Sequence, residues 1–179
     1  MGTDFAMEVC QLVDADATRA LGRRLAGRLL ERGLGVGGAT ETAPPMPAPP
    51  PLLLLQGDLG AGKTCLVHGL AVGLGITEPI TSPTFALAHH YRGAATESDS
   101  LPVPTALVHL DLYRLEQPAA AAELFAQEEE EARALGAVLA VEWPERLAFL
   151  PEPCWRVELE IAGEGRVARL FGAGISGAS

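Results

Sequence analysis

Eight consecutive residues, Gly57 to Thr64, have the sequence Gly-Asp-Leu-Gly-Ala-Gly-Lys-Thr and fit the pattern G-x-x-x-x-G-K-[ST] at every fixed position. Glycines let the backbone curl so that successive N–H groups point inward at phosphate oxygens. In such a loop, Lys63 reaches the β- and γ-phosphates and the Thr64 hydroxyl ligates Mg²⁺. The sequence therefore predicts a nucleotide-triphosphate site whose binding residues include Gly57, Asp58, Leu59, Gly60, Ala61, Gly62, Lys63 and Thr64.

The choice of cation at position 63 supports this prediction. Lys63 is the only lysine of the chain, because arginine provides the other 12 of its 13 basic residues. A compact ammonium on a flexible stem suits a phosphate-binding loop, and a planar guanidinium does not replace it well. Lysine at this position therefore indicates a chemical requirement.

Hydrolysis of a nucleotide needs a further carboxylate that holds the metal or orients the attacking water. Asp111 follows the apolar stretch of LVHLDLYRL, and Glu142 follows that of VLAVEWPERL. The carboxyl ends of parallel strands meet at the edge of a sheet where ligands bind, so both acids are predicted to face one nucleotide. His109 is interpreted as a structural residue of its strand, because no further His or Cys completes a metal site.

The segment Thr81-Ser82-Pro83-Thr84-Phe85 follows the helix expected after the loop. P-loop proteins often place a switch that the γ-phosphate orders in this part of the chain. Ser82 and Thr84 offer hydroxyl groups, and Pro83 stiffens the turn. An ordinary turn is the alternative, and position alone does not decide between the two.

Apolar periodicity predicts the elements that must position these residues. The expected strands span residues 7–13, 52–56, 86–91, 105–110, 137–141, 155–161 and 167–171, and the expected helices span 14–33, 64–74 and 119–134. Strands separated by helices and followed by a hairpin predict an α/β fold. Its P-loop NTPase-like sheet has a parallel centre and antiparallel C-terminal edge strands, with helices on both faces.

We expect one P-loop ATPase domain over residues 1–179, because this length suits a single core. Two segments interrupt it: a proline-rich exposed insertion at about 33–51 and a loop at about 93–104. The net charge of −10 disfavours unaided binding to nucleic acid. Sparse cysteines and the lack of a membrane-length apolar stretch or a signal peptide predict a cytoplasmic protein that does not associate with membranes.

Four segments in this order, GDLGAGKT, SPTF followed by HHY, HLDLYRL and VEWPERL, resemble the TsaE (YjeE) family. The likeness extends from about residue 7 to 171, and HLDLYRL combined with EWPERL is its most specific part. The resemblance implies an ATPase that hydrolyses ATP slowly and is required for the threonylcarbamoyl group on the adenosine beside the anticodon of tRNA. It also implies two protein partners, TsaB and TsaD, whose turnover the ATP cycle drives, and contact with tRNA only through that complex.

The resemblance further implies ATP and Mg²⁺ as cofactors, with Thr64 and Glu142 as metal ligands. Asp111, Glu142 and Lys63 are the implied catalytic residues, and Ser82 to Phe85 would form the nucleotide-sensitive switch. Cys65 stands where the family usually has a second threonine, and its backbone N–H would serve there. The implied nucleotide-binding residues beyond the loop are Cys65, Thr84, Trp143 and Arg166. Trp143 and Tyr113 would flank the site or the surface that binds the partners. The stretch 15–18 and Arg166 would lie near the base and ribose.

Two other functions remain open at this point. A small-molecule kinase on the same loop would need arginines on a mobile lid, for which Arg92 and Arg114 are the only nearby candidates. A nucleotide-gated binding module would bind ATP without significant turnover. A GTPase is disfavoured, because its base selection typically uses an Asn-Lys-x-Asp motif and the chain contains no asparagine. Whether Asp111 or Glu142 is the base also stays open.

Overall fold

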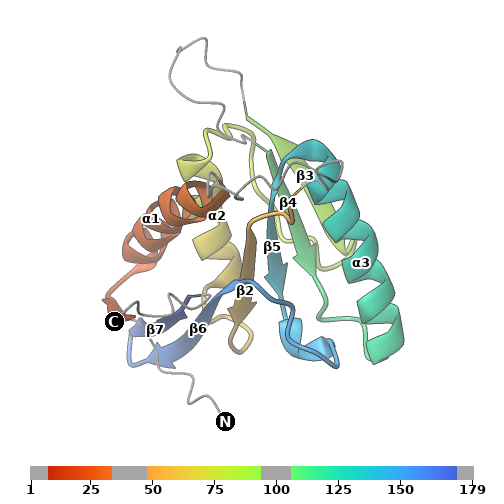
Figure 1. Ribbon diagram of the computed structural model, residues 1–179. Helices are drawn as coiled ribbons and strands as arrows, with labels where there is room; N and C mark the ends of the chain where they lie inside the picture. Colours follow the sequence, from red (N-terminus) through yellow and green to blue (C-terminus); the bar gives the residue numbers. More distant parts are fainter. Residues whose placement is uncertain (1–7, 34–47, 94–105, 173–179) are drawn as a thin grey trace, which may run out of the picture.

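A computed structural model describes residues 8–33, 48–93 and 106–172. Within these ranges seven strands form one sheet in the order β1-β7-β6-β2-β5-β4-β3 (Figure 1). The elements are β1 (Glu8–Leu12), α1 (Ala15–Gly33), β2 (Leu52–Gln56), α2 (Lys63–Gly73), β3 (Ala88–Arg92), β4 (Ala106–Asp111), α3 (Pro118–Leu135), β5 (Val138–Glu142), the 3-10 turn η1 (Pro144–Arg146), β6 (Trp155–Ala162) and β7 (Gly165–Phe171).

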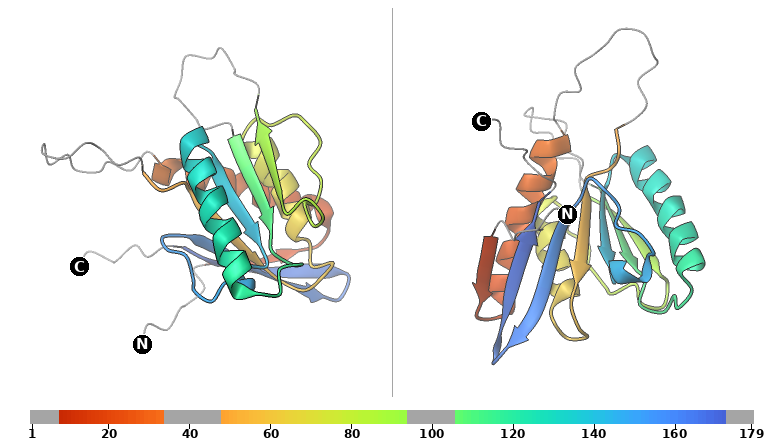
Figure 2. Two further views of the ribbon diagram at one scale, coloured as in Figure 1. Left: turned by 90° about the vertical axis from the view of Figure 1, so that its right-hand side faces the viewer. Right: turned by 60° about the horizontal axis from the view of Figure 1, so that its bottom comes forward.

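The predicted fold class is confirmed. Strands β6, β2, β5 and β4 run parallel in the centre, and β7 and β1 continue the sheet as antiparallel strands. Helices α1 and α2 cover one face and α3 covers the other (Figures 1 and 2). The opposite edge also carries an antiparallel strand, β3, which pairs with β4.

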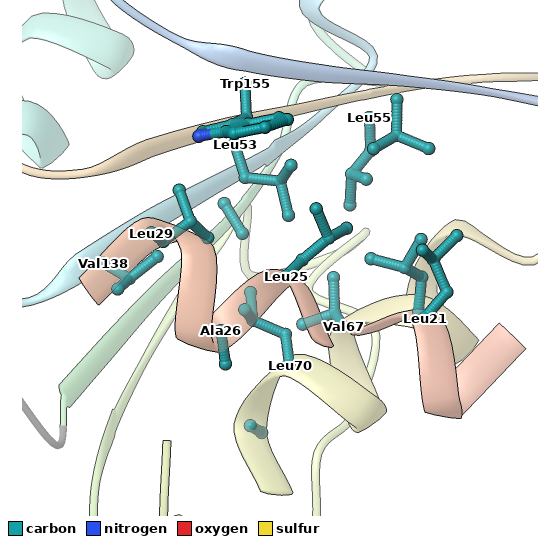
Figure 3. Packing of buried hydrophobic residues seen from close by; sticks show 14 of the residues in the cluster. Leu21, Leu25, Ala26, Leu29, Leu53, Leu55, Val67, Leu70, Val138 and Trp155 are labelled. Atoms are coloured by element: carbon teal, nitrogen blue, oxygen red, sulfur yellow. The ribbon is translucent and has the colours of Figure 1, made fainter. Parts of the chain in front are cut away.

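The larger core fills the space between the sheet and the two helices α1 and α2. Leucines at four-residue spacing, Leu21, Leu25 and Leu29, lie on the buried side of α1 and contact the sheet and α2 (Figure 3). Asp14 caps this helix, because its Oδ1 atom accepts a hydrogen bond of 2.8 Å from the backbone N–H of Ala17. The capped and buried α1 in turn holds α2 against β2.

Helices α1 and α2 approach closely at glycines. A Cβ atom on Gly69 of α2 would lie 1.9 Å from the carbonyl oxygen of Arg19, and one on Gly22 of α1 would lie 2.1 Å from that of Leu66. No side chain fits at either position. The two glycines therefore determine how near α1 comes to the helix that begins at the phosphate loop.

Most expected elements agree with the structure to within two residues at either end. Strand β3 begins at Ala88 and not at residue 86, because Leu87 has a φ of 70° and departs from extended backbone. The expected insertion and loop lie mainly in 34–47 and 94–105, outside the described residues, and the single-domain prediction stays a prediction. In the parts of the chain that the structure describes, no helix is long and apolar enough to cross a membrane.

Candidate nucleotide-binding site

The phosphate loop connects β2 to α2 at the edge where the central parallel strands end (Figure 1). Gly62 precedes the helix with a φ of 102°, which an L side chain rarely adopts. A Cβ atom on Gly57 would lie 2.5 Å from the carbonyl oxygen of Leu159 in β6. Glycine is therefore needed at position 62 for its backbone conformation, and at position 57 because the loop lies so close to β6.

Lys63 is the first residue of α2 and is only 5% exposed. Its ammonium donates hydrogen bonds to the carbonyl oxygens of Gly57 and Asp58 in its own loop. Burial lowers the pKa of Lys63 from its ordinary value, and the nearby carboxylates, above all Glu142, oppose this shift. A polyphosphate beside Nζ would favour the charged ammonium for the same electrostatic reason.

One carboxylate oxygen of Glu142, on β5, contacts side chains from two other elements. Thr64 Oγ1 on α2 donates to Glu142 Oε1 at 2.9 Å, and His109 Nε2 on β4 lies 2.8 Å from the same oxygen. Glu142 is 3% exposed and His109 is fully buried. The strand pairing puts Glu142 opposite Asp111, so the two predicted acids stand side by side at the ends of β5 and β4.

Asp111 is engaged through both carboxylate oxygens. Oδ2 accepts a hydrogen bond of 2.8 Å from the hydroxyl of Thr84, and Oδ1 accepts one of 2.9 Å from the backbone N–H of Tyr113. A further hydrogen bond of 2.8 Å joins the hydroxyls of Ser82 and Thr84. The segment predicted as a switch is therefore tied directly to one of the two acids.

Two aromatic rings form one wall of the site. Trp143, which follows Glu142 with a φ of 58°, packs against Tyr113 with ring centroids 4.9 Å apart. The Lys63 ammonium lies 4.5 Å from the centroid of the Trp143 ring, a cation–π arrangement. The cavity beside this wall is open to solvent on one side and has a volume of about 220 Å³, and its lining consists of Leu59, Gly60, Gly62, Lys63, Thr64, Cys65, Ser82, Thr84, Asp111, Tyr113, Glu142 and Trp143.

Most of the residues predicted to bind nucleotide thus line one cavity. Four do not: Gly57, Asp58, Ala61 and Arg166. Gly57 and Asp58 accept hydrogen bonds from Lys63, and Arg166 donates to the carbonyl oxygen of Gly60 at 2.9 Å. The stretch 15–18 begins α1 beside the loop, where the Cys65 thiol lies 3.5 Å from the carbonyl oxygen of Ala15.

The interpretation of His109 as only a structural residue overlooked its contact with Glu142. Side chains alternate along a strand, so His109 and Asp111 of β4 point to the same face of the sheet. Strand pairing aligns Asp111 with Glu142 on β5, which brings His109 near that acid as well. The sequence did show that His109 and Asp111 are two residues apart on one strand. It did not show which strand lies next to them, so the contact of His109 with Glu142 could not be predicted.

The donor atoms at Thr64 and Glu142 fit a magnesium ion. Mg²⁺ prefers oxygen ligands at about 2.0–2.1 Å. Thr64 Oγ1 and Glu142 Oε1 are two such oxygens, and they already lie side by side, 2.9 Å apart in a hydrogen bond. One hydroxyl and one carboxylate would leave the remaining positions to phosphate and water, as is usual for magnesium at nucleotide sites.

The parallel sheet, the glycine loop that leads into α2 and the acids at neighbouring strand ends define a protein of the P-loop class. The family model described as "Threonylcarbamoyl adenosine biosynthesis protein TsaE" matches residues 12–169. The chain therefore belongs to the TsaE family, whose members are named for the biosynthesis of threonylcarbamoyladenosine in tRNA. The predicted family is thus confirmed.

Relatives carrying the name tRNA threonylcarbamoyladenosine biosynthesis protein TsaE agree with this assignment. The protein of Nostoc sp. is 44% identical over 114 residues, which make up 64% of this chain and 65% of the relative. The protein of Synechocystis sp. is 50% identical over 103 residues, 56% of this chain and 58% of the relative. The matched stretch thus spans less than two thirds of each of these two relatives.

The protein of Treponema pallidum is 42% identical over 115 residues, 64% of this chain and 76% of the relative. Among solved structures, the crystal structure of YdiB from Bacillus subtilis has the same fold, with a TM-score of 0.58 and 24% identity. The match covers 93% of this chain and 86% of that protein.

Proposed function

We propose that this chain binds Mg-ATP and hydrolyses it slowly, as the subunit that drives turnover of a TsaB–TsaD complex in threonylcarbamoyladenosine formation on tRNA. The observation that carries the proposal is the placement of Thr64, Glu142 and Lys63 at one cavity, with 2.9 Å between the first two side chains. The tRNA and its pathway enter through the family.

Lys63 and the backbone N–H groups of the loop would bind the phosphates, and Thr64 with Glu142 would hold the magnesium ion. Magnesium bound with the nucleotide supplies positive charge that offsets the charge developing in phosphoryl transfer. The proposed role of Asp111 is to orient the attacking water. Its Oδ2 atom accepts a hydrogen bond from Thr84, which links the proposed switch segment to this acid.

The cavity also limits where the rest of the nucleotide lies. Its volume of about 220 Å³ is below the range of about 300–1,000 Å³ that encloses whole drug-sized ligands. We therefore assign the cavity to the polyphosphate. The nucleoside would lie outside it, beside the first turn of α1 and near Arg166, which hydrogen-bonds the loop at Gly60.

The proposed partners would supply what this chain lacks for work on tRNA. A net charge of −10 opposes direct binding to a polyanion, so contact with tRNA would occur through the complex. We also propose a cytoplasmic location for this chain, because its three sparse cysteines suit a reducing compartment. Co-purification with TsaB and TsaD, with and without ATP, tests the partners.

Phosphate release measured with and without purified TsaB and TsaD tests the activity. The proposal predicts slow release of phosphate in an amount equal to the ADP formed, at a rate that responds to the partners. A phosphorylated small-molecule acceptor in place of free phosphate would support the kinase alternative. Tight ATP binding with no release in a single turnover would support the nucleotide-gated module.

A further inference from the structure

His109 is a fully buried histidine whose imidazole lies 2.8 Å from the Glu142 carboxylate. We propose that His109 is a positioning residue: it holds Glu142 in the orientation in which this carboxylate binds the nucleotide's metal ion. The inference rests on the proposed function, because it assumes that Glu142 is a metal ligand. It assigns His109 no direct contact with nucleotide or metal.

The hydrogen-bond pattern determines which nitrogen of His109 carries the proton. Glu142 Oε1 already accepts the hydroxyl of Thr64 at 2.9 Å, and an ionised carboxylate can only accept. Nε2 of His109 must therefore be the donor in the second hydrogen bond to this oxygen. In the neutral imidazole, Nδ1 is then the acceptor atom.

Nδ1 of His109 is buried and has no hydrogen-bond partner among the residues that the structure describes. Most buried polar atoms in proteins are paired, so this one calls for an explanation. An apolar side chain of similar volume would fill the position without leaving a polar atom unpaired. The imidazole can donate a hydrogen bond to Glu142, and an apolar side chain cannot.

The surroundings make His109 the more rigid of the two partners of Glu142. His109 lies on β4, an inner strand between β3 and β5, and its side chain has no exposed surface. The Thr64 hydroxyl can rotate and would have to turn its lone pair toward a metal ion. The orientation of the carboxylate is thus set by His109 before ligand arrives, as outer hydrogen bonds commonly set the orientation of metal ligands.

The chain contains a second histidine–carboxylate pair that serves as a matched control. His90 Nε2 on β3 lies 2.6 Å from Glu128 Oε2 on α3. Neither residue lines the nucleotide cavity, and α3 covers the face of the sheet opposite α2 (Figure 1). Replacing His90 removes the same kind of hydrogen bond without touching Glu142.

The test is calorimetric titration of ATP into the wild-type chain and the variants His109→Leu, His109→Gln and His90→Leu, once with Mg²⁺ and once with EDTA. The measured quantity is the ratio of the two affinities. Loss of an outer hydrogen bond typically lowers metal affinity about 10–100-fold, so His109→Leu should reduce this ratio by about that factor. Its affinity in EDTA should stay within about threefold of wild type, because the loop itself is unchanged.

The Gln side chain can place an amide N–H near the position of Nε2. The ratio of the ATP affinities with Mg²⁺ and with EDTA should therefore be close to the wild-type value in His109→Gln. His90→Leu should leave it unchanged. Should His109→Leu fail to fold, His109→Gln and His109→Asn decide the matter. The shorter Asn amide would stand near Nδ1, so only the Gln variant should retain the magnesium effect.

A wild-type magnesium ratio in His109→Leu would overturn the proposal for His109 alone. Equal losses with Mg²⁺ and EDTA would do the same, because they would mean a general structural role. Equal ratios in the Gln and Asn variants would also contradict it. A wild-type chain that binds ATP no better with Mg²⁺ than with EDTA would instead overturn the proposed metal site, and the role of His109 with it.

Discussion

The charged form of Lys63 is disfavoured by burial in the folded protein and would be favoured by a bound polyphosphate. Its side chain is buried among loop carbonyls, and burial lowers its pKa, so the folded protein holds the charged form less readily than the unfolded chain does. The folded-state pKa lies below the unfolded one, so this charge reduces stability at neutral pH. A bound polyphosphate would offset that penalty with charge-assisted hydrogen bonds.

We therefore predict that Lys63→Met affects ATP binding far more than it affects stability. A hydrogen bond to a charged group contributes about 1.5–3 kcal/mol, so loss of an ammonium that contacts two phosphates should weaken ATP binding by about 100-fold or more. The melting temperature without ligand should stay within about 2–4 °C of the wild-type value, because removal of the buried charge offsets the loss of its hydrogen bonds to Gly57 and Asp58. Calorimetry and thermal denaturation measure the two effects. Full ATP affinity in a folded Lys63→Met protein would contradict the assigned role.

The two neighbouring acids should differ in what their removal affects. Asp111→Asn should leave Mg-ATP affinity nearly unchanged and slow turnover by about 100-fold or more, the usual contribution of a group that handles the attacking water's proton. Glu142→Gln should weaken magnesium-dependent binding as well as turnover, because this carboxylate, which Thr64 and His109 contact, is the proposed metal ligand.

Single-turnover phosphate release and nucleotide titration separate these effects, with Glu116→Gln on an exposed loop as the control. The assignment fails if Asp111→Asn loses binding and turnover by the same factor. It fails equally if Glu142→Gln retains full magnesium-dependent affinity.

At the scale of elements, the contact between α1 and α2 positions the helix that begins at the phosphate loop. A methyl group on Gly69 would meet the backbone of α1 at 1.9 Å, so Gly69→Ala must push the helices apart. Overpacking of this kind typically destabilises a protein by about 1–3 kcal/mol, equivalent to roughly 2–12 °C for a chain of this size. We expect ATP affinity to fall as well, because α2 carries Lys63 and Thr64.

Gly27 of α1 provides the matched control, because a Cβ atom there has nothing within 4 Å. Replacing an unhindered helical glycine with alanine typically stabilises a protein by about 0.5–1 kcal/mol. Gly27→Ala should therefore raise the melting temperature and leave ATP affinity unchanged. Two alanine variants with the same melting temperature would refute the close helix contact.

Glu8 links the edge strand β1 to α1 through ion pairs with Arg24 at 2.6 Å and Arg28 at 2.8 Å. The hydrogen bond from Arg28 holds the pKa of the Glu8 carboxyl below its ordinary range, and the Cys10 thiol and Arg24 act in the same direction. A carboxyl with a lowered folded-state pKa stabilises above its unfolded pKa, and this contribution disappears as the pH falls through the folded-state value.

Glu8→Gln should therefore lower the melting temperature at pH 7 by about 1–3 °C, since partly exposed ion pairs contribute only about 0.2–1 kcal/mol each. The difference from wild type should be smaller at pH 3 than at pH 7, because the lower pH is closer to the lowered folded-state pKa of Glu8. Thermal denaturation at both pH values, with Glu116→Gln as the control, measures it. An equal difference at pH 7 and pH 3 would show that the ion pairs are not its source.

The central elements could be predicted because their patterns are local. Apolar runs such as Leu52 to Leu55 are long enough to form buried strands, and the leucines of α1 repeat at helical spacing. The start of β3 was predicted two residues too early, because the positive φ of Leu87 depends on its hydrogen bonds. The N–H of Leu87 donates to the carbonyl oxygen of Pro83, and the carbonyl oxygen of Leu87 accepts from the N–H of Asp111. Sequence patterns do not register such contacts between distant segments.

At the scale of the whole molecule, the sheet order decides which residues meet. Strand β5 lies between β2 and β4, so the acid that ends β5 comes beside both the phosphate loop and Asp111. The sequence indicated both acids and their shared edge, because each ends an apolar strand. It did not indicate the hydrogen bond between His109 and Glu142, because that contact depends on the register of β4 against β5.

The position of Arg166 also depends on the whole fold. The hairpin β6–β7 joins the sheet next to β2, which brings Arg166 to the carbonyl oxygen of Gly60 and beside the cavity. This residue follows Thr64 by about 100 positions in the chain, and no local pattern connects the two. Its predicted contact with the nucleotide stays a prediction.

The most direct test of the central claim is calorimetric titration of Mg-ATP into the folded wild-type chain. The placement of Lys63, Thr64 and Glu142 around one cavity predicts saturable binding to a single site per chain. It also predicts that EDTA weakens this binding and that Lys63→Met weakens it by about 100-fold or more. A folded chain that shows no saturable binding of Mg-ATP would contradict the account.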